Sequence, residues 1–163
     1  MCEYIQKKPY TLKQGTILYS GNSGKKVPMT LADIFGYIGQ RGEIEIQGEF
    51  ILYASRDYNT ARGYALSCIT ERGFIHKFRV MTDVVLWQQD DFEDAELVAE
   101  CVCADVRGIV VIYSDTQDEY ALCSSQNYLE YISTQNCSHE NKFWYNIADN
   151  VTAYDLVFDV IPQ

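Results

Sequence analysis

Glu119 is the side chain whose setting most suggests catalysis. It opens the apolar segment from residue 119 to 123, and Gln117 precedes it by two residues. Because side chains alternate along a strand, Gln117 and Glu119 would share one face. A carboxylate held there can stabilise positive charge that develops on a substrate as a bond breaks. A lone glutamate at the start of a strand is more often a solvated edge residue, so the assignment depends on other segments.

The other reactive side chains form no recognisable catalytic or metal-binding pattern. The chain has six cysteines and two histidines, and neither His76 nor His139 lies in a context typical of Cys-His catalysis. Cys101 and Cys103 flank a single residue, but no second Cys or His pair follows at a spacing usual for zinc. The segment from 21 to 26 lacks the spacing of a phosphate-binding loop. We therefore expect no metal site and no nucleotide P-loop.

Composition favours one globular domain spanning residues 1–163. The chain is 47% hydrophobic and 22% charged, a balance typical of a folded protein. Its net charge of −10, without a long basic run, argues against nucleic acid as a partner. No apolar stretch is long enough to cross a membrane, and no secretory leader is evident, so we expect a soluble cytoplasmic protein with reduced cysteines and no membrane partner.

The order of the expected elements predicts an α+β fold. Asp57 can cap a helix over residues 59–71, and two further helices are expected over 31–38 and 90–104. A turn-rich segment, 20–24, follows the first strand. The expected strands are 16–19, 49–54, 74–80, 109–113, 119–123, 128–132 and 154–160. Because these elements do not repeat as β-α-β units, a doubly wound parallel sheet is excluded.

Three of these segments resemble, in the same order, the motifs of the ADP-ribosyltransferase superfamily. They read ILYSGNS at 17–23, FILYAS at 50–55 with TARGY at 60–64, and QDEYALC at 117–123 with YLEYI at 128–132. The resemblance is to the catalytic fold of the poly(ADP-ribose) polymerases and to small related domains of large DNA viruses. It implies split mixed and antiparallel sheets with short flanking helices, and it implies NAD as a substrate bound in a cleft.

The resemblance also implies roles for individual residues. Glu119 would be the catalytic carboxylate, which stabilises the oxocarbenium-like ribose as nicotinamide leaves. Tyr53 and Tyr64 would hold the nicotinamide ring between their faces. Gln117 would help to select the acceptor. The remaining cofactor-binding positions implied by the resemblance are Ser20, Gly21, and Ser55 or Thr60.

One departure from the family pattern leaves alternatives open. Ser20 stands where the family has His or Arg, and a serine supplies neither an imidazole nor a cation. The first hypothesis is an NAD-dependent mono-ADP-ribosyltransferase that modifies an unidentified protein or other acceptor. The second is a catalytically inactive relative that binds NAD, ADP-ribose or a partner protein. The third is an acidic viral or effector protein, acting in its own cell or in a host cell, whose cleft is vestigial.

Overall fold

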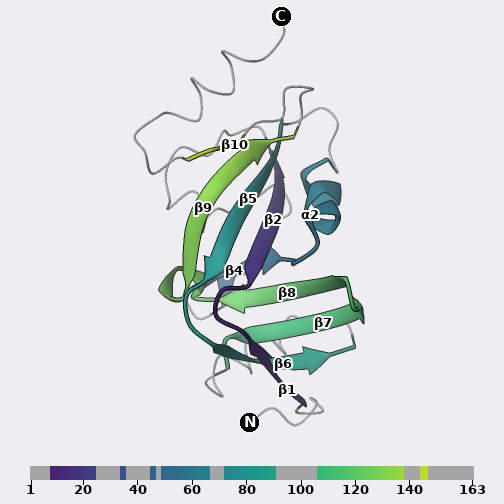
Figure 1. Ribbon diagram of the computed structural model, residues 1–163, viewed down its shortest axis with the longest axis vertical. Helices are drawn as coiled ribbons and strands as arrows, with labels where there is room; N and C mark the ends of the chain where they lie inside the picture. The colour runs from purple at the N-terminus through teal and green to yellow at the C-terminus, as the bar shows by residue number, and fades with distance from the viewer. Residues whose placement is uncertain are drawn as a thin grey trace, which may run out of the picture.

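Two β-sheets and one short helix account for most of what the computed structural model describes (Figure 1). The described residues are 8–24, 34–35, 45–46, 49–66, 72–90, 106–137 and 144–146. Within these residues the fold belongs to the α+β class, with one mixed and one antiparallel sheet, as the sequence predicts. No helix among them is long and apolar enough to span a membrane.

The first sheet, sheet A, has six strands in the order β1-β6-β7-β8-β4-β3. Only β6 and β7 run parallel; the other neighbouring strands are antiparallel. The strands are β1 (Lys8–Leu12), β3 (Glu45–Ile46), β4 (Glu49–Ala54), β6 (Val84–Gln89), β7 (Gly108–Ser114) and β8 (Gln117–Cys123). Strand β8 therefore lies inside the sheet, between β7 and β4.

The second sheet, sheet B, is antiparallel throughout, in the order β10-β9-β5-β2. Its strands are β2 (Ile17–Gly24), β5 (Arg72–Val80), β9 (Leu129–Asn136) and β10 (Trp144–Tyr145). In Figure 1 its three long strands cross the direction of β6, β7 and β8. An isolated bridge between Tyr19 and Ser55 joins the two sheets where β2 passes the end of β4.

The hydrophobic core contains apolar side chains from both sheets. Leu18, Phe74 and Phe78 come from sheet B, and Leu86 and Leu122 come from sheet A. Each of these five side chains is at most 1% exposed. Burial of a large apolar side chain stabilises a fold by about 1.5–3 kcal/mol, so this contact holds the two sheets together.

Helix α2 (Tyr58–Ala65) packs closely on the backbone of sheet B. Asp57 is its N-cap, as predicted, and accepts a hydrogen bond from the backbone N–H of Asn59 at 3.1 Å. A Cβ atom added to Gly21 would lie 1.7 Å from the carbonyl oxygen of Ala61. Only a glycine on β2 permits this approach, so the position of the helix depends on Gly21.

The structure corrects several boundaries. Residues 20–24 belong to β2 and are not a turn, because they pair with β5 from Ser20↔His76 to Gly24↔Arg72. Helix α2 ends at Ala65, with Leu66 as its C-cap, well before the predicted residue 71. Strands β1, β3, β6 and β10 were not predicted. Ile34 and Phe35 are helical, and the rest of the expected helix 31–38 lies outside the described residues. The expected helix 90–104, apart from residue 90, and the expected strand 154–160 also lie outside them.

Candidate functional site

The Glu119 carboxylate accepts two hydrogen bonds from tyrosines on two different elements. The hydroxyl of Tyr64, on α2, donates to Oε1, and the hydroxyl of Tyr113, on β7, donates to Oε2 at 2.9 Å. Hydrogen bonds to an ionised acceptor are stronger than those between neutral groups. The half-buried carboxylate is therefore fixed in place by both of its oxygen atoms.

An irregularity in β7 explains how Tyr113 reaches Glu119. The pairing of β7 with β8 passes from Ile112↔Asp118 to Ser114↔Gln117, which leaves Tyr113 as an extra residue. A bulge of this kind bends the strand and redirects the side chain of the extra residue. The sequence carried no signal for this contact, because the register of the two strands is needed to see it.

Tyr53 lies on the same face of sheet A as Glu119. It is directly opposite Ala121, which is two residues along β8 from Glu119. The side chains of Tyr53 and Tyr64 are 40% and 39% exposed, so both rings present surface to solvent. Gln117 is exposed and alternates with the buried Asp118, which places it on the Glu119 face. We call Glu119, Tyr64, Tyr113, Tyr53 and Gln117 the Glu119 face.

Ser20 does not present its side chain to this face. It is 6% exposed, and its Oγ donates to the carbonyl oxygen of Tyr53 at 2.6 Å. The hydrogen bond from the Ser20 hydroxyl therefore joins β2 to β4. The close contact with the helix at Ala61 is enough to explain why position 21 is a glycine, and no ligand is needed to explain it.

Ser55 and Thr60 are engaged in the connection between β4 and α2. Ser55 Oγ donates to Asp118 Oδ1 at 3.2 Å and accepts from the backbone N–H of Asp57 at 2.9 Å. Thr60 Oγ1 donates to Asp57 Oδ2 at 2.7 Å. Both hydroxyls shape the turn that leads into the helix, and Ser55 is only 2% exposed.

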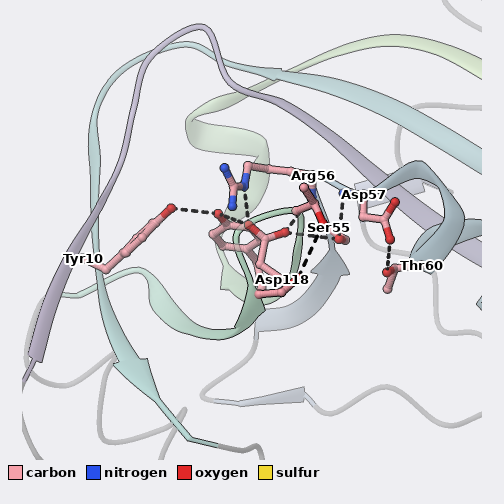
Figure 2. Close-up of polar contacts among 9 residues, drawn as sticks. Tyr10, Ser55, Arg56, Asp57, Thr60 and Asp118 are labelled. Carbon is pink, nitrogen blue, oxygen red and sulfur yellow. Dashed lines mark hydrogen bonds and ion pairs between the residues drawn. The ribbon is translucent and has the colours of Figure 1, made fainter.

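Asp118 forms the centre of a buried polar network that the sequence analysis missed (Figure 2). The side chain has no exposed surface and accepts four hydrogen bonds. The donors are the hydroxyls of Ser55 and Tyr120 and the backbone N–H and Nε of Arg56. A signal for it existed: alternation along β8 places Asp118 on the same face as the apolar core residue Leu122.

Two residues of this network, Arg56 and Tyr120, have raised pKa values. The hydrogen bond to Asp118 raises the pKa of Arg56, so its guanidinium stays charged. Burial raises the pKa of Tyr120, so its hydroxyl stays protonated. Because Tyr120 donates its only proton to Asp118, the 3.1 Å contact between the Tyr10 and Tyr120 hydroxyls requires Tyr10 to be the donor.

His76 is a second buried polar group, on sheet B. It lies opposite Ser20 on one side and Thr134 on the other. Its Nδ1 is 2.9 Å from Thr134 Oγ1, and its Nε2 has no hydrogen-bond partner among the described residues. Burial lowers the pKa of His76 from 6.5 to about 3, so the imidazole is neutral near pH 7. Within the described part of the chain, no group of three metal-binding side chains comes together.

Comparison with known proteins does not assign the chain to a family. No family model matches the sequence, and no curated protein matches it. Among solved structures, a chain from the crystal structure of the M. tuberculosis MbcT-MbcA toxin-antitoxin complex is similar in fold, with 11% identity and a TM-score of 0.49. The similarity covers 85% of this chain and 88% of that chain. At this level it assigns no function.

Proposed function

We propose that this chain is an NAD-dependent mono-ADP-ribosyltransferase in which Glu119 is the catalytic carboxylate. One observation carries the proposal. Hydroxyls from α2 and β7 hold both oxygens of Glu119, on a sheet face that also bears the exposed ring of Tyr53. A fixed carboxylate beside exposed aromatic rings suits a ligand that combines a flat ring with a sugar that becomes positively charged.

In the proposed reaction the bond between nicotinamide and ribose C1′ breaks, and its electron pair leaves with neutral nicotinamide. Positive charge develops on the ribose, and the Glu119 carboxylate stabilises it. A nucleophilic atom of the acceptor then bonds to C1′ and loses its proton. Tyr53 and Tyr64 would contact the nicotinamide ring, and Gln117 would face the acceptor.

The arrangement of the three motif-like segments supports this proposal. The first lies on β2, the second on β4 and α2, and the third on β8 and β9. Strand β4 pairs with β8, β2 meets the end of β4 through the Tyr19 bridge to Ser55, and α2 reaches β8 through the bond from Tyr64 to Glu119. Segments separated by about a hundred residues therefore adjoin, as an active site shared among them would require.

The proposal is tested by Glu119→Gln, which keeps the shape of the side chain and removes its charge. We expect release of nicotinamide, or transfer of labelled ADP-ribose to proteins of a cell extract, to fall roughly a hundredfold or more. Binding of NAD should change little, because the charge on the ribose develops only in the transition state. Glu130→Gln is the matched control, since Glu130 is an exposed strand carboxylate in an ion pair with Arg79 on sheet B.

A binding module without catalysis is the second candidate, and Ser20 supports it. The Ser20 hydroxyl is buried and donates to the Tyr53 carbonyl, at the position where the resembled family has an imidazole or a cation. A protein that binds NAD but releases nicotinamide no faster than Glu119→Gln would be a binding module. Failure of the folded protein to bind either NAD or ADP-ribose would contradict both candidates.

A further inference from the structure

Arg56 is an exposed arginine whose orientation is fixed by a buried partner. Its Nε and its backbone N–H both donate to Asp118, one to each carboxylate oxygen. Asp118 has no exposed surface, whereas the Arg56 side chain is 38% exposed. In Figure 2 the guanidinium extends from Asp118 on the side toward Tyr10. The anchored end of the side chain is therefore buried, and the other end is accessible.

The terminal amino groups of Arg56 are not used by the described part of the protein. Its hydrogen bonds to Asp118 are made through Nε and the backbone, and none to another described residue involves Nη1 or Nη2. Up to four N–H donors thus remain in a planar fork, the geometry that suits a phosphate or carboxylate.

A guanidinium held in this way binds an anion at a reduced entropic cost. A free arginine side chain loses rotamer entropy when it is immobilised on a ligand, and Asp118 has already restricted Arg56 in the folded protein. A buried carboxylate is itself costly to desolvate unless it is fully hydrogen-bonded, and here it accepts four bonds.

We propose that Arg56, anchored by Asp118, is a binding site for the phosphate groups of a ligand. Asp118 and Glu119 are consecutive on β8 and point to opposite faces, so the Arg56 site is separate from the Glu119 face. The site recognises a phosphoryl or pyrophosphoryl group, which can belong to a nucleotide or to a free phosphate compound. It does not depend on the proposed transferase activity.

The test measures binding of inorganic pyrophosphate and of ADP-ribose by calorimetry, with adenosine as a probe that lacks phosphate. For Arg56→Gln we expect pyrophosphate and ADP-ribose to bind at least roughly tenfold more weakly. Arg79→Gln is the matched control, because Arg79 is also an exposed arginine paired with a carboxylate, and it should bind like the wild type. Binding of ADP-ribose but not pyrophosphate, lost in Arg56→Gln, would identify a nucleotide as the source of the phosphate.

Two more variants protect the test against misfolding. Arg56→Lys keeps the charge but loses the fork, and the double variant Arg56→Gln with Asp118→Asn removes both charges together. Both should fold, as circular dichroism would show, and both should bind pyrophosphate and ADP-ribose more weakly than the wild type. The proposal is overturned if the folded wild type binds neither probe, or if a folded Arg56 variant binds them as well as the Arg79→Gln control does.

Discussion

His76 should make the folded protein less stable at mildly acidic pH than at neutral pH. The imidazole lies in the interior, where burial lowers its pKa from 6.5 to about 3. The unfolded chain takes up a proton near pH 6.5, and the folded chain does so only near pH 3. Between these values the unfolded state binds more protons, so the free energy of unfolding falls as the pH falls. At pH values above the unfolded pKa the two states carry the same neutral imidazole, and the effect disappears.

The size of the effect follows from the difference between the two pKa values. At about pH 5 the solution lies about 1.5 units below the unfolded pKa and well above the folded one, and each unit is worth about 1.4 kcal/mol. His76 alone should therefore reduce the free energy of unfolding by about 2 kcal/mol between neutral pH and pH 5. This is a large share of the stability of a typical domain, which is about 5–15 kcal/mol.

The assay is denaturant unfolding of the wild type and of His76→Asn at neutral pH and at about pH 5. Asparagine keeps a polar group near the position of Nδ1, which contacts Thr134, and does not titrate. We expect the loss of stability upon acidification to be about 2 kcal/mol smaller in His76→Asn, whatever its stability at neutral pH. Equal losses in the two proteins would show that His76 is not held neutral by burial, and would refute the reasoning.

Two further predictions concern the Glu119 face and the helix that contributes to it. Tyr113→Phe removes one of the two donors to Glu119 and should lower the rate of nicotinamide release roughly tenfold with little change in NAD binding. Tyr10→Phe, whose hydroxyl contacts Tyr120 on the opposite face of β8, should change neither the rate nor the binding. A parallel loss of rate and binding in Tyr113→Phe would mean that Tyr113 contacts the ligand instead of positioning Glu119. Gly21→Ala should destabilise the protein by several kcal/mol in thermal unfolding, because the new methyl group collides with the Ala61 carbonyl, and an unchanged midpoint would contradict the helix packing described above.

The sequence predicted best the strands that combine apolar alternation with clear turn signals. Strand β4 has its predicted bounds, Asp57 caps the helix that follows, and β5, β7 and β8 lie within two residues of their expected starts. Here local preference and tertiary structure agree. The α+β class followed from the order of these elements alone.

The errors arose where long-range pairing overrides local preference. Residues 20–24 are rich in Gly, Asn and Ser, which favour turns, yet they form strand because β5 pairs with them and because α2 needs a glycine at position 21. Strand β1 contains Pro9, which an edge strand tolerates because one side of β1 makes no ladder hydrogen bonds to the described residues. Neither the partner strand nor the edge position is visible in the segment itself.

The two neighbouring carboxylates of β8, Asp118 and Glu119, show that residue type alone does not predict which of them is the candidate for catalysis. Both are acidic residues at the start of the same strand, and alternation turns Asp118 toward the core and Glu119 toward the opposite face. Asp118 accepts four hydrogen bonds, so its oxygens are occupied by the protein. Glu119 accepts two, one at each oxygen, and remains half-buried, which leaves lone pairs that can meet a ligand. A carboxylate that is positioned but not saturated can respond to charge that develops beside it, and this difference makes Glu119, and not Asp118, the candidate for catalysis.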